Sequence, residues 1–215
     1  MSIEATLVDA RHFAYVAERT AGDDELLVEL KQAARAAGIP EICIEPAQAS
    51  LMAILLKLVG AREVVEVGTL AGYSAIAMAR ALPAGGRVRT IELEPAHADF
   101  AEEWIGRSDV ADRVSVLRGP GSERMAELEG PIDALFLDAD KAGYAGYLEQ
   151  SRALLRPGGL VMCDNAFAFG QLFDEHPTDR EAGAVRAFND HMATQDWLDA
   201  VIVPVGDGLW VGCVR

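Results

Sequence analysis

Two short acidic motifs carry the side chains of this 215-residue chain that are best suited to chemistry. Asp138 opens the run Asp138-Ala139-Asp140-Lys141, Asp164 is followed by Asn165, and each aspartate directly follows an apolar run. Two carboxylates and an amide oxygen are the hard oxygen ligands that Mg²⁺, Mn²⁺ or Ca²⁺ prefer. Taken singly, each aspartate is equally suited to a helix cap or a turn. Together they predict a divalent-cation site with open positions for substrate.

Lys141 follows Asp138 by three residues, so its side chain could lean over the same pocket. An amine beside a metal cation loses its proton more readily and can act as a general base. The alternative is a solvated lysine on the next helix. The neighbouring ligand motif favours the first interpretation.

A second group of residues predicts a nucleoside site. Glu63 to Ser74 combines an apolar run typical of a buried parallel strand with a turn containing Gly68 and Gly72. Such a turn lets a ligand approach the backbone at a helix N-terminus. Glu92 ends the next expected strand, where a carboxylate can accept ribose hydroxyls. The glycines alone would be equally consistent with a tight connection, but together with Glu92 they favour nucleoside binding.

The spacing of the glycines bears on which nucleoside binds. Dinucleotide sites have three glycines in the spacing G-x-G-x-x-G, which differs from the spacing of Gly68 and Gly72. Glu66 would repel a phosphate but suits the amino group and sulfonium of S-adenosylmethionine. The alternatives are an NAD-dependent oxidoreductase and a protein that binds S-adenosylmethionine without catalysis.

The elements that must position these residues alternate between strands and helices. Strands are expected at 64–67, 86–92, 114–117, 132–137, 160–163, 200–203 and 209–214. Helices are expected within 6–37 in two pieces, and at 47–58, from 72, from about 95, at 144–155 and at 181–194. This alternation predicts an α/β, doubly wound, Rossmann-like fold with a mainly parallel sheet, helices on both faces and ligands at the carboxyl ends of its strands. Neither repeats nor linkers divide the chain, so we expect a single domain over 1–215, with N-terminal helices in 1–60 and the core in 61–215.

Composition excludes several classes of function. The formal net charge of -15 disfavours nucleic-acid partners. The three cysteines lack zinc-ligand spacing, and the apolar stretch from Leu51 is broken at Lys57, too early to span a bilayer. Since the N-terminus also lacks a signal-peptide pattern, we expect a cytoplasmic protein with no membrane partner.

From about residue 45 onward, the chain resembles the cation-dependent O-methyltransferases, the family of catechol and caffeoyl-coenzyme A O-methyltransferases. The resemblance depends on the joint order of five motifs: Val65-Glu66-Val67-Gly68-Thr69 with Gly72-Tyr73-Ser74, Phe136-Leu137-Asp138-Ala139-Asp140-Lys141, Asp164-Asn165, Arg186-Ala187-Phe188-Asn189 and Pro204-Val205-Gly206-Asp207-Gly208.

The resemblance implies a role for each candidate residue. Those near the methionine part of the cofactor or in its loop would be Glu66, Gly68, Thr69 and Ser74, with Asp138 also at the cofactor site. Glu92 would hold the ribose and Gly121 would lie by the adenine. Asp138, Asp164 and Asn165 would be the metal ligands and Lys141 the general base. The family also implies a seven-stranded sheet with the last strand antiparallel, and a homodimer.

The implied reaction is methyl transfer from S-adenosylmethionine to a hydroxyl of a catechol-like small aromatic, which is a vicinal diol. One position departs from the family. Where many members have an aromatic residue three positions beyond the metal asparagine, this chain has Ala168, between Phe167 and Phe169. We expect a reshaped acceptor pocket that one of these phenylalanines lines, while at least one packs in the core.

Overall fold

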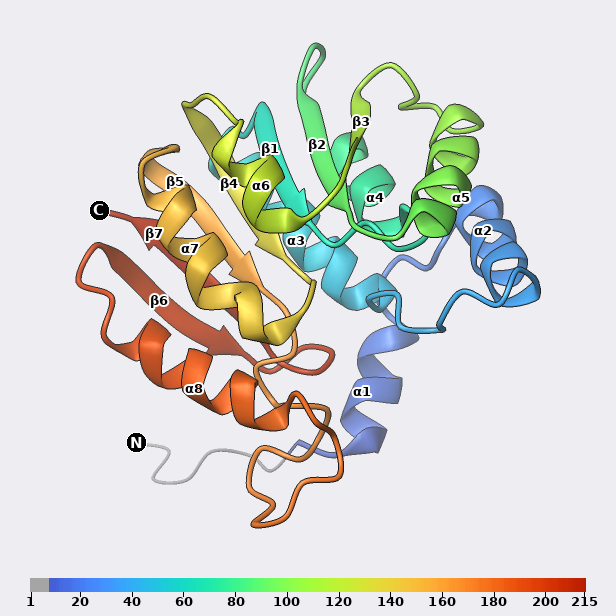
Figure 1. Ribbon diagram of the computed structural model, residues 1–215. Coiled ribbons are helices and arrows are strands. Elements are labelled where there is room, and N and C mark those ends of the chain that lie inside the picture. The colour runs from blue at the N-terminus through green and yellow to red at the C-terminus, as the bar shows by residue number, and fades with distance from the viewer. Residues whose placement is uncertain (1–7) are drawn as a thin grey trace.

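The computed structural model describes residues 8–215, in which a seven-stranded sheet lies between two layers of helices (Figure 1). The strands are β1 (Glu63–Val67), β2 (Arg87–Glu92), β3 (Val114–Arg118), β4 (Ile132–Leu137), β5 (Leu155–Cys163), β6 (Leu198–Val203) and β7 (Leu209–Val214). The helices are α1 (Ala10–Ala17), α2 (Glu25–Ala36), α3 (Pro46–Leu58), α4 (Tyr73–Ala81), α5 (Pro95–Gly106), α6 (Gly121–Ala126), α7 (Tyr144–Arg152) and α8 (Ala182–Ala193), with a 3₁₀ turn, η1 (Lys141–Gly143).

The strand order is β3-β2-β1-β4-β5-β7-β6, in which β7 runs antiparallel to both of its neighbours. The predicted doubly wound sheet with an antiparallel last strand is therefore confirmed. The order reverses between β1 and β4, where ligands bind in such sheets. Just beyond these strands, Asp138 N donates to Val67 O at 2.9 Å and Asp164 N donates to Leu137 O at 3.0 Å. The ends of β1, β4 and β5 therefore lie side by side.

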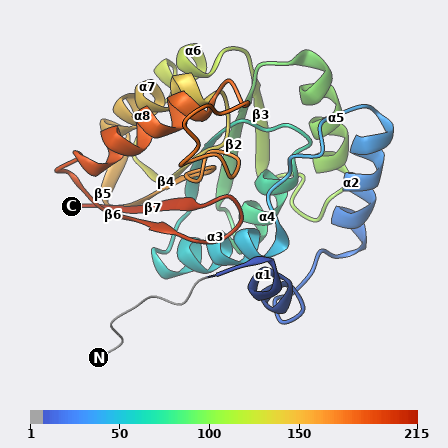
Figure 2. The same ribbon diagram turned by 90° about the horizontal axis from the view of Figure 1, so that it is seen from below.

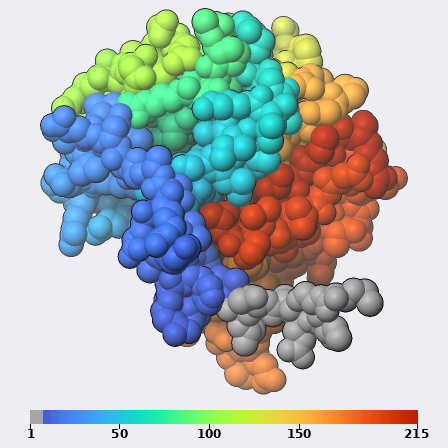
Figure 3. Space-filling model, turned by 180° about the vertical axis from the view of Figure 1, so that it is seen from behind, coloured from blue at the N-terminus to red at the C-terminus, as the bar shows by residue number. Residues whose placement is uncertain are grey.

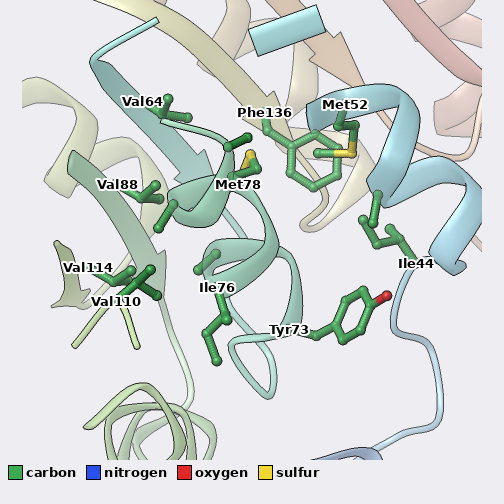
Figure 4. Packing of buried hydrophobic residues seen from close by; sticks show 14 of the residues in the cluster. Ile44, Met52, Val64, Tyr73, Ile76, Met78, Val88, Val110, Val114 and Phe136 are labelled. Carbon is green, nitrogen blue, oxygen red and sulfur yellow. The ribbon is translucent and has the colours of Figure 1, made fainter. Parts of the chain in front are cut away.

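Each face of the sheet has its own apolar core. Helices α2 to α5 cover one face, where Met52 of α3 and Met78 of α4 lie beside Phe136 of β4 (Figure 4). Helices α6, α7 and α8 cover the other face, seen in front of the sheet in Figure 1 and above it in Figure 2. Because both faces are covered, the central strands β1 and β4 are mostly apolar, as is usual for buried parallel strands.

The structure differs from the expected elements around β5. This strand begins at Leu155 rather than at 160, and α7 ends at Arg152 rather than at 155. Leu155 pairs with Ile132, and the register shifts before Ala134 pairs with Leu160, so the Pro157-Gly158-Gly159 segment is an irregularity inside the strand. The short helix α6 was not expected from the sequence.

The N-terminal helices lie at the edge of the molecule. Asp24 caps α2 by accepting a hydrogen bond from Leu27 N at 3.0 Å. Helix α1 has no buried residue. The view from behind shows α1, α3 and the β6–β7 hairpin on one face (Figure 3).

Within residues 8–215, no helix combines the length and the apolarity that crossing a bilayer requires.

Candidate active site

A cavity of about 550 Å³ opens at the carboxyl ends of β1, β2 and β4, where the strand order reverses. Its wall includes five residues predicted from the sequence: Gly68, Glu92, Gly121, Asp138 and Lys141. A narrow side pocket is lined by Gly68, Thr69, Ser74 and Asp138. Most of the predicted cofactor residues thus surround one cleft.

Glu66 is fully buried behind Ser74, and the Ser74 hydroxyl donates a hydrogen bond to its Oε1. Its other oxygen, Oε2, has no hydrogen-bond partner among the described residues. Burial raises the pKa of Glu66 to about 8, and the negative charges of Asp138 and Glu92 act in the same direction. A buried carboxylate oxygen without a partner is costly unless a cation compensates it. This environment fits the positively charged end of S-adenosylmethionine.

Glu92 is held by the backbone. Its Oε2 accepts hydrogen bonds from Thr69 N at 3.2 Å and Leu70 N at 2.8 Å, and its Oε1 accepts one from Glu94 N at 2.9 Å. The end of β2 therefore fixes the loop after β1. With three amides on the carboxylate, its orientation is set before any ligand arrives.

Two glycines of the cleft permit close approaches. A Cβ on Gly68, whose φ is 104°, would lie 1.9 Å from the carbonyl oxygen of Asp138, so the cofactor loop touches the backbone of the metal motif. A Cβ on Gly121 would lie 2.8 Å from the Tyr147 hydroxyl. That hydroxyl donates to Asp140 Oδ1 at 2.7 Å. Tyr147 also lines the cleft and was not singled out from the sequence.

Lys141 is almost completely buried and contributes to the wall of the cleft. Its Nζ donates to Asp138 Oδ1 at 3.1 Å and to Tyr144 Oη at 2.7 Å, while the Tyr144 hydroxyl donates to Leu137 O at 3.0 Å. Burial raises the pKa of Tyr144 far above its ordinary value, so this tyrosine stays protonated. The ion pair with Asp138 and the hydrogen bond to Tyr144 thus fix the position of the Lys141 Nζ at the cleft.

Asp164 lies beside this pair. Gln48, a buried residue of α3, donates from Nε2 to Asp164 Oδ1 at 2.9 Å. Burial and the negative charge of Asp138 raise the pKa of Asp164 to about 7, so the two carboxylates are close enough to repel each other. Two crowded carboxylates with oxygen atoms to spare fit a hard divalent cation.

Asn165 completes the predicted ligand set and adopts a left-handed backbone conformation with φ of 65°. Its Nδ2 donates to Asp207 Oδ2 at 3.2 Å, which leaves the amide oxygen for another partner. No group of three His, Cys, Asp or Glu side chains suited to a metal occurs in residues 8–215. The candidate site therefore depends on the amide of Asn165 as its third ligand.

The two phenylalanines beside Ala168 have different environments. Phe167 packs on Gly208, where an added Cβ would lie 2.9 Å from the ring. Ala168 is fully buried, and Phe169 lines the cleft with its ring centroid 6.0 Å from Lys141 Nζ. Phe169 is thus exposed on the wall of the cleft, while Phe167 is half-buried against Gly208, and neither belongs to a hydrophobic core cluster of the described residues, so the expected core packing is not seen.

Sequence reasoning missed four residues that hold the predicted ones in place, and they are Gln48, Tyr144, Tyr147 and Asp207. Tyr144 could have been noticed, since it follows Lys141 by three residues, the spacing of side chains on one helical face. Asp207 belongs to the motif Pro204-Val205-Gly206-Asp207-Gly208, but no spacing in the sequence indicates which residue its side chain contacts. No sequence pattern indicates a role for Gln48.

Comparisons with known proteins agree with this geometry. A family model described as O-methyltransferase matches residues 17–215. A catechol O-methyltransferase of Niastella koreensis is 35% identical over 193 residues, covering 88% of this chain and 87% of that protein. One from Mycobacterium tuberculosis is 35% identical over 201 residues, covering 93% and 91%. A solved O-methyltransferase from Bacillus cereus in complex with SAH superposes with a TM-score of 0.85 and 32% identity, covering 94% and 96%. The chain therefore belongs to the S-adenosylmethionine-dependent O-methyltransferase family.

Proposed function

We propose that this protein transfers the methyl group of S-adenosylmethionine to a hydroxyl of a catechol-like small aromatic with the help of a divalent cation. The observation that carries the proposal is the ion pair of Asp138 with the buried Lys141 on the wall of the cleft, next to the buried Asp164, whose amide donates to Leu137 O at the end of β4. The names of the two relatives, both catechol O-methyltransferases, support the choice of acceptor.

The donor would occupy the cleft between the ends of β1 and β2. Glu66 and Ser74 would compensate its positively charged amino group, and the loop at Gly68 and Thr69 would pass along its methionine part. Glu92 would accept hydrogen bonds from the ribose. The adenine end would lie at Gly121, with Tyr147 and Asp140 beside it.

Asp138, Asp164 and Asn165 would hold the cation, with Mg²⁺ first and Mn²⁺ or Ca²⁺ as alternatives. When bound, such a cation would supply positive charge that favours the ionised form of an acceptor hydroxyl. Lys141 would receive the proton at Nζ while Asp138 and Tyr144 keep the amine in place. Phe169 would contact the acceptor ring, and the alignment of the two reactants would supply much of the acceleration.

Turnover with a panel of catechols, measured with Mg²⁺ and then with excess chelator, tests the proposal. We expect methylation that chelation abolishes and added Mg²⁺ restores. Turnover unchanged in chelator would reject the metal role. Binding of S-adenosylmethionine without methylation of any catechol would instead support a protein that binds the donor for another purpose.

The role of Lys141 has its own test. Lys141→Ala should lower kcat by about 10²- to 10⁴-fold, the usual contribution of a general base, while the Kd for the donor changes less than about threefold. Lys57→Ala, which removes an exposed lysine at the end of α3, is the matched control. Equal kcat in the Lys141 variant and in wild type would remove the base assignment.

We also propose a cytoplasmic homodimer of single-domain subunits, with N-terminal helices in 1–60 and the core in 61–215. The three free cysteines suit a reducing compartment. Helix α1 supports a dimer, because Tyr15 and Val16 are exposed on it and Val8 is exposed just before it. Light scattering of the purified protein should give twice the mass of one chain; the mass of one chain would reject the dimer.

A further inference from the structure

The turn between β6 and β7 carries Asp207, whose carboxylate reaches the loop that follows β5. Its Oδ2 accepts hydrogen bonds from Asn165 Nδ2 at 3.2 Å and from Phe169 N at 2.7 Å, and its Oδ1 accepts one from Gly170 N at 3.2 Å. The backbones are joined as well, since Phe167 N donates to Asp207 O at 2.8 Å. One side chain therefore contacts both the predicted metal asparagine and the backbone of the aromatic residue in the cleft.

The loop needs this support because three of its non-glycine residues lie in the left-handed region. The φ angles are 65° at Asn165, 54° at Ala168 and 58° at Phe169. Residues with side chains rarely adopt this region unless the surroundings hold them there. Asp207 supplies such a hold, because it accepts the amides of Phe169 and Gly170, and it also accepts the side-chain amide of Asn165.

The same turn also contacts Gln48, which holds a second predicted metal ligand, Asp164. A Cβ on Gly206 would lie 2.2 Å from Gln48 Oε1, so this glycine leaves room for the glutamine that donates to Asp164 Oδ1 at 2.9 Å. Because Gln48 and Asp207 bond the other polar atoms of Asp164 and Asn165, each of these two residues keeps one side-chain oxygen for a cation. The turn contributes no residue to the wall of the cofactor cleft.

We infer that Asp207 is a positioning residue that sets both the metal ligand Asn165 and the acceptor wall at Phe169, without acting on the donor site. The inference rests on the proposed function, since it assigns Asn165 to the metal and Phe169 to the acceptor. It predicts that one substitution weakens metal and acceptor together and leaves the donor unaffected.

The experiment uses the full chain with Asp207→Ala and Asp207→Asn. Mn²⁺ binding is measured by electron paramagnetic resonance without acceptor, donor binding by calorimetry, and KM with a catechol. Asp207→Ala should weaken Mn²⁺ binding about 10- to 100-fold, the usual effect of losing an outer partner of a metal ligand, and raise KM for the catechol. Donor Kd should change less than about twofold. Asp207→Asn keeps one acceptor oxygen and should show a smaller shift in the same direction.

Asp199→Asn is the matched control, since Asp199 lies on the adjoining strand β6 and its carboxylate, within residues 8–215, bonds only Arg215, at 2.8 Å on the surface. Wild-type Mn²⁺ affinity in both Asp207 variants would overturn the inference, whatever their thermal stability. Parallel losses of donor and metal binding would also overturn it, because they indicate general damage. If Asp207→Ala does not fold, Asp207→Asn decides by the same comparison. Absence of Mn²⁺ binding by the wild-type protein would refute the proposed metal role itself, and this inference with it.

Discussion

The two proposed parts of the site, a donor side and a metal side, are built in different ways. On the donor side, backbone amides of neighbouring loops bind Glu92, whose partners Thr69 and Leu70 are 23 and 22 residues away in sequence. On the metal side, side chains from distant elements hold the ligands, with Gln48 116 residues from Asp164 and Asp207 42 residues from Asn165. The donor side follows from a local strand–turn–helix unit, whereas the metal side requires α3 and the β6–β7 turn to be in place. The two sides should therefore respond differently to substitution.

The largest effect is expected where the two sides touch. Gly68→Ala would place a Cβ 1.9 Å from the carbonyl oxygen of Asp138 at a φ of 104°, so backbone must move on both sides. We expect the affinity for the donor to fall more than about 100-fold and the affinity for Mn²⁺ to fall with it, because the substitution strains the backbone and creates a steric clash. Gly60→Ala is the control, because its φ is also positive, at 63°, but nothing lies within 4 Å of the added carbon. Loss of donor binding alone would show that the two backbones are less tightly connected than their contact implies.

Glu92→Gln should separate the two sides. In the wild type, backbone N–H groups donate to the Glu92 carboxylate. The glutamine side chain would place its own N–H group against them and would weaken any hydrogen bond to a ribose. We expect the donor Kd to rise about 10-fold or more and the Mn²⁺ Kd to stay within about twofold. This pattern is the reverse of that expected for Asp207. A matching loss of Mn²⁺ affinity would contradict the separation.

Glu66→Gln tests the buried carboxylate through pH. The folded pKa of about 8 lies above the ordinary value of 4.5, so the folded state favours the protonated acid. Its contribution to stability is complete below about 4.5 and is lost as the pH rises through about 8. Glutamine mimics the protonated acid and does not titrate. In cofactor-free protein, the melting temperature of wild type should therefore fall below that of the variant by a growing margin up to about pH 8. A difference between the two melting temperatures that does not change with pH would refute the raised pKa of Glu66.

The smallest effect on activity is expected far from the cleft, at the amino end of β4. Asp133 accepts hydrogen bonds from Arg62 N at 2.7 Å, Glu63 N at 2.8 Å and Arg156 Nε at 2.5 Å. Burial alone would raise the pKa of Asp133, but these donors outweigh burial and lower it. Its stabilisation is thus present above the unfolded pKa and lost as the pH falls. Asp133→Asn should lower the free energy of unfolding by about 1–3 kcal/mol in denaturant titrations, with kcat unchanged. A change in kcat would show that this end of the sheet influences the site.

The contrast also explains what could be predicted from the sequence. Glu66, Gly68 and Glu92 could be proposed as site residues because strand ends and turns are local patterns, and the strand order brings the end of β4, with Asp138, beside the end of β5, with Asp164. Gln48 and Asp207 could not be found, because a hydrogen bond between distant segments leaves no spacing to detect. The start of β5 was wrong for a related reason. The pairing of Leu155 with Ile132 depends on a register shift, and not on the composition of the strand.

Carboxylates outnumber the basic side chains of Lys and Arg on the wall of the cleft, which includes Glu92, Glu94, Asp138, Asp140 and Glu181 but only Lys141 and Arg180 among the described residues. The donor of this family arrives with a positive sulfur, and the spent molecule leaves with a neutral thioether. The negative potential of the wall therefore attracts the fresh molecule more strongly than the used one. For the donor site proposed here, we therefore expect the acidity of the cleft to favour release of the by-product and to limit inhibition by it, an advantage that added salt should diminish.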